Sequence, residues 1–439
     1  MSNLRNDRRF RRFWAAQAIS QFGDRVSELA LPLLAIGLLR ATPGQIGLLT
    51  AAIWLPYLAS FLIGSWVDQR RDKRRILVTA DLARATVLTS LPIAWLLDVL
   101  TLPQVFAVAL LNGLGEVFFT TTAPSVFVKL VPRESYLSAN SSLSSTRSAS
   151  FLAGPAIGGV MVQVLTAPVA VLADALSFLA SAFLVGRIRI SVSNPENRST
   201  ETLSGPGEID GRRELEAEPP TRTEPGGRRV LEGLWFLARH PYLRASLASA
   251  ATVNFFSFIG STLLVLFASR TLGMSAGLIG LAFGLGATGG LLGALVAPRL
   301  AGRYGVGIVA IFGAFLYPAS FALPAVAGGP TALAAGVLVG AEFLGGFGVM
   351  LFDVNINSLQ ASLIPDEMRS RVAGAFSTVN YGVRPLGALT GGLLGTTIGI
   401  RPTLVVAAIG GAASCLWLWR SPIRRVRTLA DLPLGQLWL

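Results

Sequence analysis

The sequence predicts an all-α integral membrane protein, with twelve transmembrane helices in two pseudo-symmetric six-helix bundles. Three observations support this fold class: an apolar composition, apolar runs of helix length and an internal repeat. Of the 439 residues, 52% are apolar and 14% are charged, which is too little polar surface for a soluble protein of this length. A bilayer core about 30 Å thick needs about 20 apolar residues per helix, and such runs recur along nearly the whole chain.

The apolar runs define the individual helices. They are rich in Ala, Leu and Gly and lack the alternating pattern of a membrane β-barrel. The expected spans lie at 13–39, 46–67, 76–97, 103–128, 139–164, 168–187, 243–270, 276–298, 305–327, 331–357, 370–397 and 402–420.

The distribution of basic residues predicts the orientation. The net charge is +13, which in a soluble protein would suggest nucleic acid as a partner. Here the arginines cluster in alternate loops, as in 5–12, 70–75 and 420–427, and the intervening loops carry few. Basic residues stay on the side that is not translocated, so both termini are expected in the cytoplasm, and no nucleic-acid partner is expected.

One polar segment divides the spans six and six. Residues 190–229 hold few large apolar side chains and predict a flexible linker, and residues 230–241 fit a short amphipathic helix on the membrane surface. The predicted organisation is a six-helix bundle over 1–189, a cytoplasmic linker with this helix over 190–241, a second bundle over 242–421 and a cytoplasmic tail over 422–439.

A comparison of the two halves supports a duplication. At an offset of 233 residues, identical residues recur in three places of the chain. Paired repeats around a central pathway are a transporter architecture. The matching pairs are Ile46 and Ile279, Gly47 and Gly280, Pro132 and Pro365, Glu134 and Glu367, Gly154 and Gly387, Gly158 and Gly391, and Gly159 and Gly392.

The first span contains a polar stripe. Gln17, Gln21, Asp24 and Glu28 are spaced four, three and four residues apart, so they share one face of a helix. Ionisable groups are costly inside a bilayer, and both burial and like-charge repulsion disfavour the charged form of a carboxylate. The stripe is therefore expected to line the pathway, with Asp24 or Glu28 exchanging a proton. The alternative is a structural ion pair with Arg25 or with a neighbouring helix.

Further polar side chains inside the spans are weaker candidates for the pathway. Each fits a helix-to-helix hydrogen bond or ion pair equally well. They are Asn112 and Glu116 in the fourth span, Arg147 in the fifth, Asn254 in the seventh, Glu342 in the tenth, and Asn380 and Arg384 in the eleventh.

Enzymatic chemistry and resident cofactors are not expected. The sequence has no GxxxxGK[ST] phosphate-binding loop, no cluster of metal ligands and no arrangement of nucleophile and base. His240, the only histidine, precedes the seventh span, where a structural or surface role is expected.

The loop after the second span carries a recognisable pattern. Gly64 permits close helix contact, Asp68 is suited to cap a neighbouring helix, and the arginines are suited to pair with carboxylates across the cytoplasmic face. This resembles the loop signature of the major facilitator superfamily, which implies a role in conformational gating. Gln69 departs from that signature, and the loop glycine is missing. The residues assigned to this network are Gly64, Asp68, Arg71, Arg74, Asp81 and Arg84.

The fifth span contains the string Gly154-Pro155-Ala-Ile-Gly158-Gly159. Pro removes a backbone hydrogen bond and bends a helix, and the glycines allow another helix to pack closely. The string resembles the Gly-Pro-x-x-Gly-Gly signature of antiporters in this superfamily.

Four further segments are similar to the third drug:proton antiporter family, which includes macrolide and multidrug efflux proteins and the enterobactin exporter. They are Gly23–Pro32, Ala139–Asn140, Asp174–Phe178 and Glu232–Pro241. The resemblance covers all twelve spans and implies the major facilitator fold. The fourth span lacks the Arg-containing signature of other drug antiporters and has Glu116 instead.

The resemblance implies a monomeric, proton-coupled exporter of small amphipathic molecules, of the drug, antibiotic or siderophore class, that works by alternating access. Its expected partners are the substrate, protons and the lipid bilayer, and its expected location is the bacterial cytoplasmic membrane. Two alternatives stay open: a proton-coupled importer on the same fold, and a membrane sensor or assembly protein without transport activity.

Overall fold

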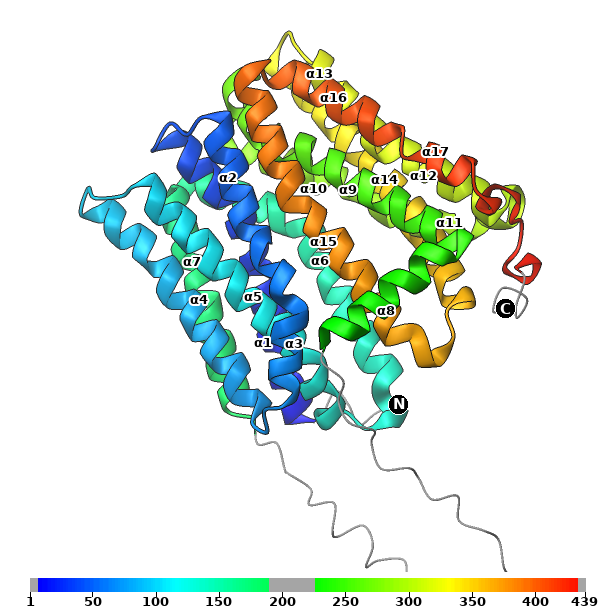
Figure 1. Cartoon of the computed structure of the whole chain (residues 1–439). Helices are drawn as coiled ribbons and strands as arrows, with labels where there is room; N and C mark the ends of the chain where they lie inside the picture. The colour runs from blue at the N-terminus through cyan, green and yellow to red at the C-terminus, as the bar shows by residue number, and fades with distance from the viewer. Residues whose placement is uncertain (1–6, 189–225, 433–439) are drawn as a thin grey trace, which may run out of the picture.

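The structure, a computed structural model, describes residues 7–188 and 226–432, and every regular element in these two stretches is helical. Two groups of helices, α1–α7 and α9–α17, lie side by side (Figure 1). The first group consists of α1 (Arg8–Gly37), α2 (Pro43–Trp54) continued by η2 (Leu55–Ala59) and α3 (Ser60–Asp68), α4 (Lys73–Leu96), α5 (Leu102–Leu130), the short η3 (Arg133–Ser135), α6 (Tyr136–Leu165) and α7 (Ala167–Gly186).

The second group repeats this arrangement. It consists of α9 (Pro241–Leu266) continued by η5 (Phe267–Thr271), α10 (Ala276–Gly286), α11 (Thr288–Tyr304), α12 (Val306–Ala319), α13 (Ala322–Val326), α14 (Thr331–Leu363), α15 (Asp366–Thr397), α16 (Ile400–Ala412), α17 (Cys415–Trp419), η6 (Pro422–Arg425) and η7 (Leu429–Asp431). The pairs α10 and α11, α12 and α13, and α16 and α17 each form one span, because helix follows helix with little or no interruption.

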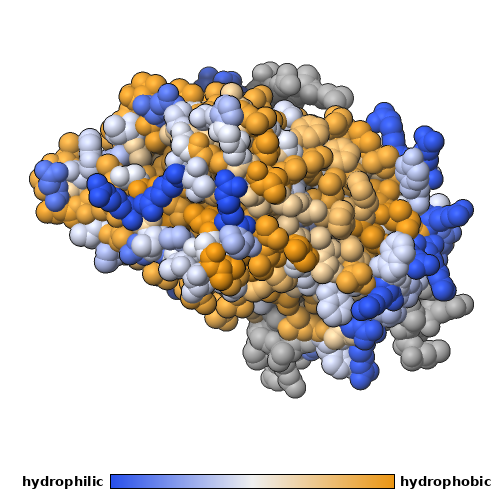
Figure 2. All heavy atoms as spheres, turned by 90° about the horizontal axis from the view of Figure 1, so that it is seen from above, coloured by the Kyte–Doolittle hydropathy of each residue, from blue (hydrophilic) through white to orange (hydrophobic). Residues whose placement is uncertain are grey.

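Ten of the twelve helical segments in the described stretches are long and apolar enough to cross a membrane; α1 and α15 are the other two. Both helices carry ionisable side chains, which lower their hydropathy. These include Asp24, Arg25 and Glu28 on α1 and Arg384 on α15. The predicted all-α fold with twelve spans is confirmed. Hydrophobic residues dominate the face seen from above in Figure 2, as expected for a surface in contact with lipid.

The polar linker predicted over 190–229 lies largely outside the described residues. The amphipathic helix after it, α8 (Gly226–Arg239), begins four residues before the predicted start at 230 and ends two before the predicted end at 241. It packs against α15, where Glu232 lies 2.8 Å from Arg371. A side chain at Gly233 would collide with the carbonyl of Arg371, so α8 needs a small residue there. The assignment of α8 to a linker between two bundles stays a prediction.

The two ends of the helices differ in charge, and we name them accordingly. The Arg-rich end is where α3 joins α4, with Arg70, Arg71, Arg74 and Arg75. The Arg-poor end is where α1 joins α2. Arg270, on η5 at the Arg-poor end, donates to the carbonyl of Ile36 at 3.2 Å and so links the two halves there.

Two glycine-to-glycine crossings join the halves towards the Arg-poor end. A Cβ atom added to Gly47 of α2 would lie 2.8 Å from the Cα atom of Gly392 of α15, and one added to Gly159 of α6 would lie 2.8 Å from that of Gly280 of α10. At the offset of 233 residues between the halves, Gly47 corresponds to Gly280 and Gly159 corresponds to Gly392. The two crossings are therefore equivalent under the pseudo-symmetry of the halves. Only a residue without a side chain permits such close approach of two helix backbones.

Polar contacts accompany both crossings. Gly44 N donates to Thr396 Oγ1 at 3.0 Å between α2 and α15. Gln163 Oε1 of α6 accepts from Ser275 Oγ at 3.0 Å and from Gly277 N at 2.9 Å, at the start of α10. The two halves are therefore closed against each other at the Arg-poor end.

His240 connects α8 and α9 at the Arg-rich end. It is buried between Phe236 and Tyr242, with ring centroids 6.2 and 5.8 Å away. Within the described residues its Nδ1 atom has no hydrogen-bond partner. Burial lowers the pKa of His240, so the folded protein holds this ring in its neutral form. The predicted structural role fits this position.

The variant His240→Phe should reduce the acid sensitivity of the purified protein. Because the folded pKa lies below the unfolded value of about 6.5, the unfolded chain takes up the proton first, and stability falls as pH drops through that value. Thermal unfolding in detergent at about pH 7.5 and pH 5.5 should show a smaller loss of Tm in the variant than in the wild type. An unchanged pH dependence would contradict this account of His240.

The variant Gly280→Val should weaken closure of the Arg-poor end. Overpacking typically costs about 1–3 kcal/mol, so closed molecules should become about tenfold rarer or more. Cross-linking between cysteines placed at Thr42 and Thr396, in a Cys415→Ser background, measures this closure. Gly340→Val is the matched control, because no atom lies within 4 Å of a Cβ at that position. Equal cross-linking in both variants would refute the role of the crossing.

Candidate functional site

Arg84 is the centre of a charged cluster in the N-terminal half. It lies midway along α4, and it is only 2% exposed. Its Nη2 atom lies 2.5 Å from Asp24 Oδ1 on α1 and 4.0 Å from Glu116 Oε2 on α5. Its Nε donates to Asn112 Oδ1 at 3.0 Å, and its guanidinium lies 3.9 Å from the ring centre of Phe178 on α7. A buried guanidinium requires such partners, so four helices meet around this one side chain.

A second ion pair lies next to this cluster. Arg25 Nη1 is 2.6 Å from Glu28 Oε2, and this pair is more exposed, at 32% and 62% of the two side chains. This contact is the ion pair with Arg25 that was the alternative to a pathway role for the stripe. Asp24, Glu28 and Glu116 carry three negative charges when ionised, against the two positive charges of Arg25 and Arg84. These five groups together leave one unbalanced negative charge.

The polar stripe of the first span is divided between several partners. Gln21 Nε2 lies 3.5 Å from Gln17 Oε1, and Gln21 Oε1 is buried without a hydrogen-bond partner in the described part of the chain. Asp24 forms an ion pair with Arg84, and Glu28 forms one with Arg25. The structure therefore places these residues on one helix but in different interactions, and their role in a pathway stays a prediction.

Two further carboxyl groups are bound by serine hydroxyls. Asp174 on α7 accepts from Ser177 at 3.1 Å and from Ser27 on α1. Asp81 on α4 accepts from Ser181 on α7 at 2.6 Å. Sequence reasoning named Asp174 only within a family resemblance. An acidic residue inside a span, followed three positions later by a serine, was a signal of buried hydrogen bonding.

Asp81 and Arg84 were expected in the third span as an extension of the loop network, and their role in gating stays a prediction. Both are buried, at 0% and 2% exposure, and they bind α7, α1 and α5 inside the N-terminal half. The sequence spacing correctly placed them on one helix but could not show which neighbouring helices they face.

The loop itself makes different contacts from those expected. Asp68 pairs with Lys73 at 3.4 Å, and Arg74 donates to the carbonyls of Gly186 and Ile188 at 3.2 and 3.0 Å. Arg71 is exposed. No described atom lies within 4 Å of a Cβ at Gly64, so the expected close helix contact is not formed in this conformation. The tight contacts between the halves lie nearer the Arg-poor end instead.

The Gly-Pro string of the fifth span packs as expected from its small residues. Side chains at Gly154 and Gly158 would collide with Arg25 and Val26 of α1, and Gly159 forms the crossing with α10. Pro155 lies inside the continuous helix α6. The string therefore contacts both the charged cluster and the other half of the molecule.

The C-terminal half has its own cationic centre at Arg384 on α15. Its Nε donates to Asn254 Oδ1 on α9 at 3.2 Å. Its guanidinium lies 4.4 Å from the ring centre of Trp54, 4.5 Å from that of Tyr381 and 5.3 Å from that of Phe258. Trp54 belongs to α2, so this cation–π contact crosses between the halves.

Tyr57 connects the two centres. It lies on η2, its side chain faces Glu116, and its ring lies 5.1 Å from those of Trp54 and Tyr381. Sequence reasoning missed Trp54, Tyr57 and Phe258, because aromatic residues inside apolar runs are indistinguishable in sequence from residues that face lipid.

The remaining predicted residues lie apart from Arg84. Glu342 on α14 packs against α10, where a Cβ on Gly286 would collide with it. Asn380 Oδ1 is buried without a partner in the described part of the chain. Arg147 lies exposed on the part of α6 nearer the Arg-rich end. In the described stretches no group of three or more His, Cys, Asp or Glu side chains is arranged to hold a metal ion.

The pair of Arg84 and Asp24 should be strongly coupled in stability. Breaking a buried pair typically costs about 3–5 kcal/mol, so Arg84→Gln and Asp24→Asn should each lower the Tm in detergent by many degrees. The loss of Tm in the double variant should be clearly smaller than the sum of the losses in the two single variants. Glu28→Gln, in the exposed pair, should have little effect. Additive losses would show that the two side chains do not interact.

Comparison with known proteins supports this architecture. The pattern of the Major Facilitator Superfamily matches residues 13–388. An uncharacterized MFS-type transporter of Bacillus subtilis, YfiS, is 24% identical. The aligned region covers 92% of this chain and 90% of the YfiS chain. The multidrug efflux pump Tap of Mycolicibacterium fortuitum is 23% identical over 81% of both chains. Macrolide efflux protein A of Streptococcus pyogenes is 25% identical over 42% of this chain and 45% of its own.

Solved structures share the fold at lower identity. A bacterial homologue of the iron transporter ferroportin in an inward-facing state has a TM-score of 0.69 and 17% identity, covering 95% of this chain and 99% of its own. The nucleoside transporter NupG has a TM-score of 0.67 and 14% identity, covering 93% of this chain and 96% of its own. Because the family pattern spans most of the sequence and the fold agrees throughout, the chain belongs to the Major Facilitator Superfamily and is a multi-pass membrane transporter.

Proposed function

We propose that the protein exports small amphipathic molecules by alternating access, as a monomeric proton antiporter of the bacterial cytoplasmic membrane. The observation that carries this proposal is that two carboxyl groups, those of Asp24 and Glu116, face the single guanidinium of Arg84. Relatives named as a multidrug efflux pump and a macrolide efflux protein support the direction of transport.

The two ends of the molecule support a cytoplasm-facing state. The positive-inside rule assigns the Arg-rich end to the cytoplasm, with both termini on that side. The halves are held together towards the other end by the glycine crossings. From Ser144 to Phe151, most residues of α6 are exposed, on the part of the helix that lies beyond its closest contacts with α10. A substrate would therefore enter from the cytoplasm.

Charge balance couples the substrate to the proton. With Asp24 and Glu116 ionised, the two carboxylates that face the buried Arg84 hold one negative charge in excess of its own positive charge. Either one proton or one cationic substrate group removes this excess, which is costly inside the membrane. Two ligands that satisfy the same charge compete, and this competition gives exchange rather than joint transport.

Glu116 is the carboxylate we assign to proton exchange. Asp24 has the shorter contact with Arg84, at 2.5 Å, whereas Glu116 lies 4.0 Å away and its side chain is 33% exposed. Asp24 therefore serves as the fixed counter-ion of Arg84. Glu116 also faces Tyr57, whose ring contacts Tyr381 of the other half. A change of charge at Glu116 therefore alters the contacts of Tyr57 at the boundary between the halves.

A proteoliposome assay tests the exchange directly. Vesicles with a trapped pH indicator and an imposed pH gradient are supplied with ethidium or erythromycin as amphipathic cations. The proposal expects proton movement that depends on the compound and runs opposite to it. Movement of compound and protons in the same direction would favour the importer, and no compound-dependent proton flux across a panel of amphipathic compounds would refute antiport.

The variant Glu116→Gln should separate binding from coupling. Without the exchangeable carboxyl group, accumulation driven by the pH gradient should fall by about 10²-fold or more, the lower range for loss of an essential acid–base group. Exchange of labelled compound without a gradient should persist. Glu134→Gln is the matched control, because Glu134 is exposed in η3 at the Arg-rich end. Unchanged gradient-driven accumulation in Glu116→Gln would contradict the assignment.

A further inference from the structure

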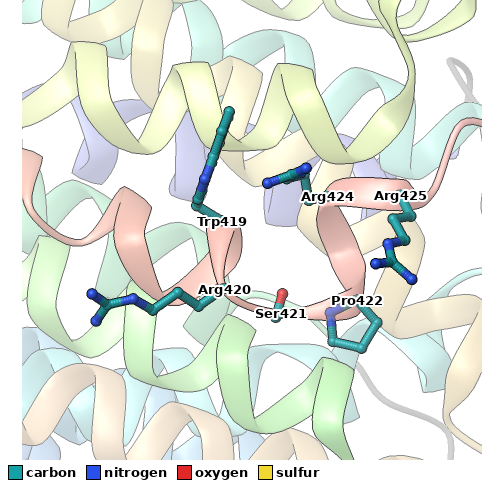
Figure 3. Close-up of a pocket in the computed structure, with 6 residues that line it drawn as sticks. All are labelled: Trp419, Arg420, Ser421, Pro422, Arg424 and Arg425. Carbon is teal, nitrogen blue, oxygen red and sulfur yellow. The ribbon is translucent and has the colours of Figure 1, made fainter.

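A hollow lies at the end of the last span, away from the charged cluster. It has a volume of about 380 Å³ and is lined by six of the seven residues between Trp419 and Arg425, at the Arg-rich end. Figure 3 shows the side chains of Trp419, Arg420, Ser421, Pro422, Arg424 and Arg425 arranged around the turn that follows α17. Three arginine residues therefore line one small surface depression. In Figure 3 the guanidinium group of Arg424 lies toward Trp419, and those of Arg420 and Arg425 lie on opposite sides of the turn.

These arginines have no acidic partner in the described part of the chain. Arg424 lies over the ring of Trp419, 4.6 Å from its centre, and all three guanidinium-bearing residues are exposed. Asp431, the nearest acidic residue in sequence, is engaged elsewhere: its Oδ2 accepts from the backbone of Thr428 at 2.7 Å and of Arg427 at 3.1 Å. These backbone bonds lower the pKa of Asp431. The arginines are thus available to an external anion.

An apolar strip leads along the last span to this hollow. Ile409 is 68% exposed, and Leu416, Trp417 and Trp419 are 46%, 54% and 49% exposed. In contrast, Leu418 between them is fully buried. The strip therefore faces outward from the bundle, where acyl chains lie in a membrane.

The level of the hollow matches a membrane interface. Two other Arg-over-Trp pairs occur at the same end of the molecule: Arg70 lies 4.5 Å from the ring centre of Trp66, and Arg239 lies 3.8 Å from that of Trp235. Tryptophan is enriched where the acyl chains meet the head groups, and arginine extends its charge towards that level.

We propose that this hollow binds the phosphate head group of an anionic phospholipid, with the acyl chains lying along the strip from Ile409 to Trp419. Arginine recognises phosphate by paired, charge-assisted hydrogen bonds, and basic residues at this level attract anionic lipids. The strip gives a lipid an apolar contact that inorganic phosphate lacks. The site is independent of the proposed transport mechanism.

Native mass spectrometry of the full chain tests the proposal. Phosphatidylglycerol should bind more tightly than phosphatidylcholine, and Arg424→Gln with Arg425→Gln should weaken phosphatidylglycerol binding about tenfold or more. The matched control is Arg299→Gln with Arg303→Gln, which removes two charges near the same end and should leave binding unchanged. Equal binding by the two double variants would overturn the proposal, as would complete displacement of the lipid by millimolar inorganic phosphate.

A second test measures the fluorescence of Trp419 and leaves the arginines unaltered. The fluorescence of Trp419 is obtained as the difference between the wild type and Trp419→Phe. Brominated phosphatidylglycerol should quench this difference signal more than brominated phosphatidylcholine does, because the lipid would rest against that ring. Equal quenching by the two lipids would overturn the proposal.

Discussion

The architecture depends on two symmetry-equivalent contacts between helix backbones, Gly47 with Gly392 and Gly159 with Gly280. Because neither crossing leaves room for a Cβ atom, the two halves meet closely towards the Arg-poor end and are free to diverge towards the other. Small residues perform this function in membranes because helices there gain little from burying apolar side chains and associate through close packing. Close packing at one end leaves the helices at the other end free to separate.

The charged cluster depends on the same packing. Gly154 and Gly158 bring α6 against α1 at Arg25 and Val26, and the next residue, Gly159, forms the crossing to the other half. A movement of α6 during opening would therefore reach the helix that carries Asp24 and Glu28. Tyr57 supplies a second connection, from Glu116 to the aromatic side chains around Arg384. In the proposed mechanism, charge and conformation are linked through these two contacts.

Much of this organisation was predictable from the sequence, for definite physical reasons. Hydropathy and the distribution of arginine predicted the spans and their polarity, and the repeat at 233 residues predicted equivalent glycines. Periodicity could not predict which helices meet, so the pairing of Arg84 with Asp24, sixty residues away, was not foreseen. Trp54 and Tyr57 were missed because an aromatic residue at the boundary between the halves and one that faces lipid have the same local sequence signal.

The central claim is that one negative charge in the cluster is shared between proton and substrate. Proton release on binding of ethidium to the purified protein, in weakly buffered detergent solution with a pH indicator, measures this most directly. The account predicts release of about one proton per ethidium bound at a pH where the cluster is protonated, and no release from Glu116→Gln. Stoichiometric binding to the wild type without any proton release would contradict it.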